Sequence, residues 1–260
     1  MKYLQREVKA KSAYIIPMSD LHIGDKHFNE KKAKEYIDWV KKHENARIFL
    51  NGDILNVATR TSASSPFEQD MDLSEQIDKA VELFEPVKHQ IIGAITGNHE
   101  NRIEQHCGYN PIRHLCQQLG IPYLGTSAVI ALRVCDGKHK RKSKPGGNFT
   151  TYILYFHHTT GGGSTPGGKV NRVEKLRSII TNADAYIGSH SHQIFAVPML
   201  GTHYSGAKNG IVKQRQMLIG SGSFLEWNDS YAEKMQLEPV KLGCPRIRLS
   251  AESKDVHVSI

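Results

Sequence analysis

The chain has 260 residues, of which 39% are hydrophobic, so it can bury a full core and we expect one α/β domain spanning residues 1–260. The four cysteines lack Cys-x-x-Cys spacing, which argues against a zinc knuckle and a disulfide framework. The sequence shows no apolar run near the roughly 20 residues of a membrane span and no signal peptide, so we expect a soluble, cytoplasmic protein without membrane contact. The net charge of +8 is compatible with a polyanionic partner but common without one, whereas the 14 histidines are more unusual.

The first predicted strand runs directly into a candidate metal-binding motif. Ala13–Met18 is an apolar run typical of a buried strand, and Asp20-Leu21-His22 follows it. Residues two apart in an extended segment share a face, so the carboxylate and the imidazole can point to one place, and both are usual ligands of first-row metals. An isolated Asp-x-His is also typical of a solvated loop.

A helix and a second strand come next. The helix is predicted after Asn29, a plausible N-cap, because apolar residues recur at helical spacing up to Val40. The strand Arg47–Leu50 then leads to Asp53, although an ordinary Gly-Asp turn could also explain that residue. Residues 59–66 are rich in Ser and Thr and indicate a surface loop near the same place.

The third strand completes a strand–helix–strand–helix–strand pattern. A second helix follows a capping box at Asp72 and Glu75, and the strand Gln90–Thr96 leads into Gly97-Asn98-His99-Glu100. This pattern predicts parallel strands whose carboxyl ends meet at one edge of the sheet, where ligands of α/β proteins bind. The residues expected at this edge are Asp20, Asp53 and Asn98.

Another helix and two strands follow. The helix is predicted between Asn110 as N-cap, with Pro111 at its first position, and Gly120. The strands Val129–Val134 and Thr150–Phe156 flank a basic hairpin tip, residues 138–147. Such a tip is typical of a solvated loop, or it contacts a phosphate backbone.

The strand ending at Phe156 is followed by His157-His158 and a Gly-rich turn. Gly163 to Lys169 nearly matches the phosphate-binding loop Gly-x-x-x-x-Gly-Lys, but Val170 stands where a magnesium-binding Ser or Thr is needed, so we reject a nucleotide-binding loop of that kind. Backbone amides of this turn and Lys169 could still line a substrate pocket.

The next predicted strand, Ala183–Ile187, ends in Gly188-Ser189-His190-Ser191-His192. His-x-His in an extended segment places both imidazoles on one side and is a metal signal, although a plain surface pair is the alternative. The rest of the chain predicts antiparallel partner strands near residues 195–200, 212–219, 246–249 and 256–260.

Five successive strand ends therefore carry Asp-x-His, Gly-Asp, Gly-Asn-His-Glu, His-His and His-x-His. In this order, from Asp20 to His192, the chain resembles the calcineurin-like metallophosphoesterases. The resemblance implies an α/β fold, a four-layer α/β/β/α sandwich of two mixed sheets with a dinuclear metal site at the strand ends. Ser189 replaces the glycine usual in the family, a change expected to alter backbone freedom more than ligation.

The resemblance also implies roles for individual residues. The first metal would be held by Asp20, His22, Asp53 and His192, and the second by Asp53, Asn98, His190 and either His157 or His158. We choose His158, because related sequences place the ligand histidine just before a short Gly-rich turn. His99 is left without a metal, as the general acid or donor near the leaving oxygen. Glu100 has no assigned role beyond that of a carboxylate orienting an imidazole.

The implied reaction is phosphoester hydrolysis, in which two divalent ions clamp the phosphoryl group and a hydroxide shared by them attacks phosphorus. Manganese is the favoured metal, with Fe, Zn, Ni or Mg as alternatives. The basic residues favour a phosphodiester or nucleic-acid substrate, DNA or RNA, and the alternative is a phosphomonoester phosphatase with Arg102 and Lys169 as phosphate clamps. A non-catalytic metal-bound binding module is disfavoured because every motif position is filled. No protein partner can be inferred.

Overall fold

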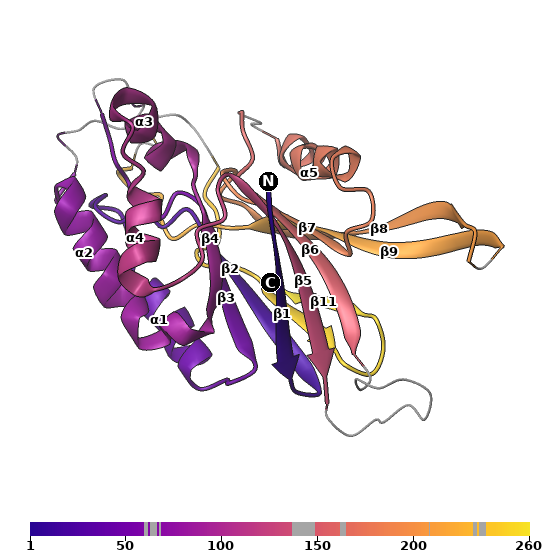
Figure 1. Cartoon of the computed structure of the whole chain (residues 1–260). Coiled ribbons are helices and arrows are strands. Elements are labelled where there is room, and N and C mark those ends of the chain that lie inside the picture. The colour runs from indigo at the N-terminus through magenta and orange to yellow at the C-terminus, as the bar shows by residue number, and fades with distance from the viewer. Residues whose placement is uncertain are drawn as a thin grey trace.

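The protein forms four layers in the order helices, sheet, sheet, helix (Figure 1). The computed structural model describes residues 1–59, 62, 67, 69–136, 149–161, 165–207, 209–230, 233 and 238–260. The basic hairpin tip at residues 138–147 and most of the predicted loop at residues 59–66 lie outside this part of the chain. The α/β/β/α architecture that the resemblance implied is confirmed.

One sheet has five strands in the order β11-β10-β2-β3-β4. Its parallel part consists of β2 (Ser12–Met18), β3 (Ala46–Asn51) and β4 (Ile91–Ile95), so the predicted parallel arrangement is confirmed. The strands β10 (Arg246–Ser250) and β11 (Val256–Ser259) extend it with antiparallel pairs.

The other sheet has six strands in the order β1-β5-β6-β7-β9-β8. They are β1 (Lys2–Lys9), β5 (Ser127–Cys135), β6 (Thr150–His157), β7 (Ala185–Gly188), β8 (Ile194–Ser205) and β9 (Gly210–Ser221). The sequence did not predict β1, an edge strand whose side chains are mostly exposed. The antiparallel prediction holds between β8 and β9, but β9 is parallel to its other neighbour, β7.

The helices begin and end where local capping signals place them. Asn29 caps α1 (Glu30–Lys41), and a capping box of Asp72 and Glu75 begins α2 (Leu73–Phe84). Asn110 caps α4 (Pro111–Leu119), which ends at Gly120 in the left-handed conformation, as predicted. The remaining helices are α3 (Asn98–Cys107), α5 (Pro166–Lys175) and the short 3₁₀ helices η2 (Glu85–Gln90) and η3 (Leu176–Ser178). The sequence did not predict α3.

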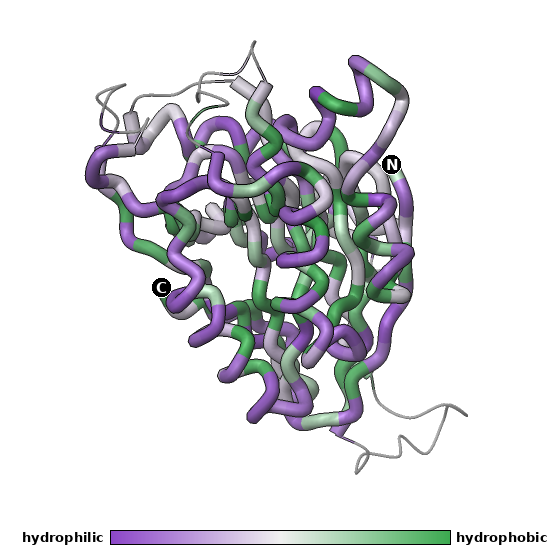
Figure 2. Tube along the Cα trace, turned by 90° about the vertical axis from the view of Figure 1, so that its left-hand side faces the viewer, coloured by the Kyte–Doolittle hydropathy of each residue, from purple (hydrophilic) through white to green (hydrophobic). Residues whose placement is uncertain are grey.

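Three apolar cores join the four layers. One lies between α1, α2, α4 and the five-stranded sheet, one between the sheets, and one between α5 and the six-stranded sheet. Figure 2 shows hydrophobic residues gathered along the interior strands and hydrophilic residues on the outer turns. Phe49 and Phe156 stack across the two sheets with ring centroids 3.8 Å apart, and each buried ring stabilises the fold by about 1.5–3 kcal/mol.

This central core fixes the two sheets against each other, so the carboxyl ends of strands from both sheets share one edge of the molecule. In the part of the chain that the structure describes, no helix is long and apolar enough to cross a membrane.

Candidate metal centre

Metal-ligand side chains from both sheets meet at this shared edge. The five-stranded sheet supplies residues after β2, β3 and β4, and the six-stranded sheet supplies residues after β6 and β7. Three overlapping groups have ligand atoms that all lie within 4.8 Å of one another: Asp20, His22 and His192; His22, Asp53 and His99; Asp53, His158 and His190. The strand ends singled out in the sequence therefore come together in space.

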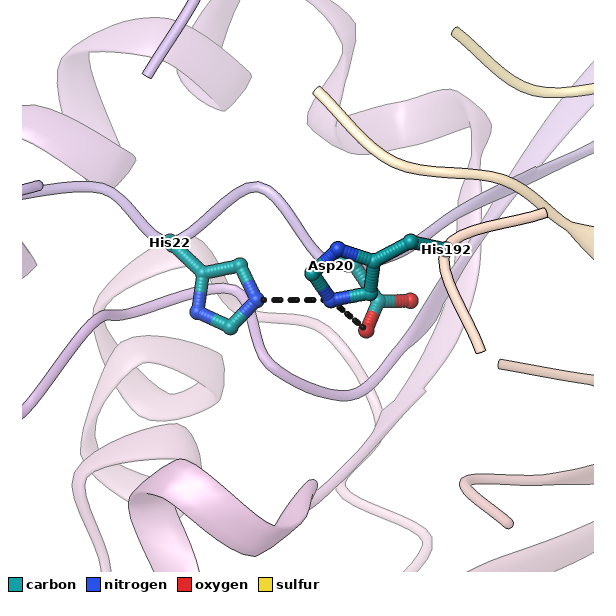
Figure 3. A group of neighbouring side chains, drawn as sticks. All are labelled: Asp20, His22 and His192. Atoms are coloured by element: carbon teal, nitrogen blue, oxygen red, sulfur yellow. Dashed lines mark hydrogen bonds and ion pairs between the residues drawn. The ribbon is translucent and has the colours of Figure 1, made fainter. Parts of the chain in front are cut away.

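The first group centres on the His192 ring (Figure 3). Its Nε2 lies 3.4 Å from Nε2 of His22 and 3.3 Å from Oδ1 of Asp20. Burial lowers the pKa of His22 well below its usual value, so that ring is neutral, and its Nδ1 is buried without a hydrogen-bond partner among the described residues. Imidazole nitrogens beside a carboxylate form a donor set that suits a divalent first-row cation.

The third group contains His158. Its Nε2 lies 2.8 Å from Oδ1 of Asn98 and 3.2 Å from Oδ2 of Asp53. Burial by itself would lower the pKa of His158, but the Asp53 carboxylate outweighs that effect and raises the pKa to about 9. Burial likewise opposes ionisation of Asp53, yet the imidazoles of His158 and His99 hold its pKa well below the usual range. The space beside Asp53 therefore favours a positive charge.

The backbone at these positions differs from the extended conformation that we expected. Left-handed backbone angles, rather than strand alternation, direct the side chains, and each such residue costs roughly 1–3 kcal/mol unless the surroundings enforce it. The φ angles are 49° at Asp20, 52° at His22, 50° at Asp53, 76° at His190 and 56° at His192. Strain at so many candidate ligands indicates that the turns are shaped for the site.

His99 lies against the cluster in a defined orientation. Its Nδ1 donates to the carbonyl oxygen of Asn56 at 2.5 Å, its backbone N–H donates to Oδ1 of Asp53 at 2.9 Å, and its Nε2 lies 3.9 Å from Oδ2 of Asp53. The residue is 8% exposed, and burial lowers its pKa. Nε2 therefore faces the candidate metal centre. The sequence did not reveal the contact with Asn56, because the acceptor is a backbone carbonyl, which every residue type carries.

Glu100 fastens the backbone of the site. We expected a carboxylate that orients an imidazole, but its oxygens accept hydrogen bonds from backbone N–H groups of Ile54 at 2.6 Å, Leu55 at 3.0 Å and Gly97 at 2.9 Å. Burial, with the neighbouring Asp53 charge, raises the pKa of Glu100 to about 7. It thus ties the start of α3 to the loop that carries Asp53.

Ser189 and His157 occupy different surroundings. The Ser189 backbone is outside the left-handed region, so glycine is not required there, and its hydroxyl lies 2.8 Å from Nδ1 of His158, a contact that the sequence did not suggest. His157 is the last residue of β6 and lies beside the Tyr155 ring, with centroids 6.3 Å apart. The cluster of ligand atoms contains His158 and not His157.

The two predicted phosphate clamps lie on different helices, Arg102 on α3 and Lys169 on α5. Arg102 donates to the Ser62 hydroxyl at 2.7 Å, and its charge contributes to the lowered pKa of His99. Lys169 is 8% exposed; its backbone N–H donates to the Thr165 carbonyl oxygen, and its side-chain ammonium group makes no hydrogen bond or ion pair with any other residue that the structure describes. It lies one helical turn before Val173, which packs against Gly188 at the end of β7.

The chain is similar to known proteins in sequence pattern and in fold. A family model described as calcineurin-like phosphoesterase matches residues 18–194, and no curated protein matches the chain. A crystal structure of the calcineurin-like phosphoesterase YfkN from Bacillus subtilis is similar, with 11% identity and a TM-score of 0.43 over 96% of this chain and 88% of that chain. The NAD nucleotidase NadN of Haemophilus influenzae aligns with 12% identity and a TM-score of 0.43 over 96% of this chain and 49% of that chain.

The family match covers more than half of the chain and runs from the end of β2 to the start of β8. It includes every side chain of the three ligand groups. This chain therefore belongs to the calcineurin-like phosphoesterase family.

Proposed function

We propose that the protein is a metal-dependent phosphoesterase that hydrolyses phosphodiesters, with nucleic acid as its favoured substrate class. The observation that carries this proposal is the chain of three overlapping ligand groups, in which His22 belongs to two groups and Asp53 belongs to two. A carboxylate common to two groups is suited to bridge two cations.

In this proposal the seven ligands divide between two divalent ions. One ion would be held by Asp20, His22, Asp53 and His192, and the other by Asp53, Asn98, His158 and His190. The mixed nitrogen and oxygen donors suit Mn²⁺, with Fe, Zn, Ni or Mg as alternatives. Bound ions of this kind neutralise phosphate charge and lower the pKa of a nucleophilic water.

His99 supplies the proton for the leaving oxygen. Its ring is fixed by the hydrogen bond to the Asn56 carbonyl, which leaves Nε2 facing the cluster. Because burial lowers the pKa of His99, its protonated form is a stronger acid than free imidazole. Arg102 lies on the same side of α3, three residues further on, and its guanidinium would contact a non-reacting phosphate oxygen of the substrate.

The preference for diesters rests on charge. The chain carries a net charge of +8, and the ammonium group of Lys169 has no anionic partner among the described residues, which suits an extended polyanion. The second candidate is a phosphomonoester phosphatase, in which Arg102 and Lys169 clamp the doubly charged terminal phosphate.

A substrate panel tests the proposal. The purified protein with Mn²⁺ is assayed on a bis-aryl phosphate, an aryl monophosphate, single- and double-stranded DNA, and RNA, with Asp53→Asn as the inactive control. We expect cleavage of the diester and of at least one nucleic acid. Turnover of the monoester without cleavage of any diester would establish the phosphatase instead, and no turnover of any substrate would overturn the proposed function.

A further inference from the structure

The buried hydroxyl of Ser189 connects the two sheets next to the His158 ring. Ser189 is 1% exposed, and its Oγ–H donates to the carbonyl oxygen of Asn51, the last residue of β3, at 2.6 Å. The same Oγ lies 2.8 Å from Nδ1 of His158. Because the serine proton is engaged by the carbonyl, the hydroxyl is left as an acceptor for the imidazole.

The surroundings of the ring then determine where its proton sits. The Asn51 carbonyl oxygen is also 3.1 Å from Nδ1 of His158, so both polar neighbours of Nδ1 are acceptors. A neutral His158 must therefore carry its hydrogen on Nδ1 and its lone pair on Nε2, the nitrogen that faces Asn98 and Asp53.

The backbone of Ser189 is itself held in place. Its carbonyl oxygen accepts a hydrogen bond from Oγ1 of Thr159 at 2.6 Å, and Thr159 directly follows His158 in the chain. The segments after β6 and β7 are thereby joined to each other, and the serine hydroxyl joins both to β3. Hydrogen bonds to the backbone and to the side chain of Ser189 therefore hold its hydroxyl in one position.

We propose that Ser189 is a positioning residue that holds His158 in the Nδ1–H tautomer with its Nε2 directed toward Asn98 and Asp53, where it would serve as a ligand of the second metal. This inference rests on the proposed function, because it assigns a task to a residue that contacts a proposed ligand. The glycine that Ser189 replaces has no side chain and could not make this hydrogen bond. Groups that orient a metal-binding histidine typically change metal affinity by about 10–100-fold when they are removed.

Metal binding by matched serine variants tests the inference. Ser189→Ala and Ser189→Gly are compared with the wild type by equilibrium dialysis against Mn²⁺, with Ser221→Ala as the control. Ser221 is also buried, but its hydroxyl contacts Ser19 and the Gly188 carbonyl, and it contacts no imidazole of the described residues. We expect both Ser189 variants to bind one of two ions about tenfold more weakly and the other as the wild type does. Ser221→Ala is expected to bind both normally.

Imidazole nitrogen NMR of the zinc-loaded protein gives a readout independent of activity. In the wild type the Nδ1–H signal of His158 should exchange slowly with solvent, and in Ser189→Ala it should exchange faster or broaden. Unchanged affinity and an unchanged signal in both Ser189 variants would overturn the role of Ser189 while leaving the proposed function intact. A similar loss in Ser221→Ala would also overturn it. If the wild type bound no divalent ion, the proposed function and this inference would both be wrong.

Discussion

His99 is held by hydrogen bonds that keep one ring nitrogen free for chemistry. The Asn56 carbonyl binds Nδ1, and the backbone N–H of His99 is bound by the Asp53 carboxylate. Removing the ring leaves that backbone contact in place. A mutation of His99 should therefore leave metal binding intact, whereas a mutation of its neighbour Asn98, a proposed ligand, should weaken it.

We expect His99→Ala to bind both metal ions but to lose turnover by about 10²–10⁴-fold on a substrate with a poor leaving group. The loss of turnover should be smaller on an aryl ester, because its leaving group needs less protonation. The measurements are kcat and metal content. His106→Ala removes an exposed histidine from the same helix and serves as the control. Full activity of His99→Ala on an unactivated substrate would contradict this role.

The adjacent residues His157 and His158 make a second comparison at the residue scale. His158 lies within the ligand cluster, whereas His157 packs near Tyr155 on the opposite side of β6. We expect His158→Ala to lose one of two metal ions and His157→Ala to retain both, as measured by metal analysis after dialysis. The reverse pattern would assign the second metal to His157.

At the scale of elements, the close approach of α3 to the loop after β3 depends on Gly97. A Cβ at this position would lie 2.1 Å from Oδ1 and 2.3 Å from the backbone nitrogen of Asp53, well inside contact distance. Both groups belong to the turn that Glu100 fastens. Gly97 is needed because strand, helix and loop meet here with no room for a side chain.

We expect Gly97→Ala to displace Asp53, to weaken metal binding and to lower the free energy of unfolding by about 1–3 kcal/mol, as overpacked cores do. Chemical denaturation and metal titration measure the two effects. Gly167→Ala on α5 is the matched control, because a Cβ there meets no atom within 4 Å. Normal metal affinity in Gly97→Ala would show that the turn adjusts without moving the carboxylate.

At the scale of the whole molecule, the candidate metal centre joins the two sheets. Asp20, His22, Asp53 and Asn98 follow strands of the five-stranded sheet, whereas His158, His190 and His192 follow strands of the six-stranded sheet. Metal ions at this position would link the sheets at one edge, as the central apolar core links them along their length.

Metal binding should therefore stabilise the fold. At a free ion concentration about 100 times the dissociation constant, one ion that binds only the folded state adds about 2.7 kcal/mol to the free energy of unfolding. We expect Mn²⁺ to raise the Tm of the wild type and chelation by EDTA to reverse the rise. In Asp53→Asn, Mn²⁺ should raise Tm much less. Scanning calorimetry measures each Tm. Equal Tm with and without Mn²⁺ in the wild type would contradict this linkage.

Several features of the molecule are set by short stretches of sequence. The caps at Asn29 and Asn110 and the capping box at Asp72 were predicted correctly, because each depends on residues within one helical turn. The parallel order of β2, β3 and β4 followed from the alternation of strands and helices. Since parallel strands end at one edge, the sequence also predicted which strand ends would meet.

Other features depend on contacts between distant segments. The helix α3 begins inside the motif because Glu100 accepts backbone N–H groups from the loop after β3, 45 to 47 residues earlier, and the partner of edge strand β1 lies on β5. The same holds for Ser189, whose hydroxyl meets a carbonyl 138 residues away. The sequence by itself determined the residue types of the site and the sheet edge that carries them. Only the tertiary structure decided their orientation, because left-handed turns and buried hydrogen bonds persist only where distant segments enforce them.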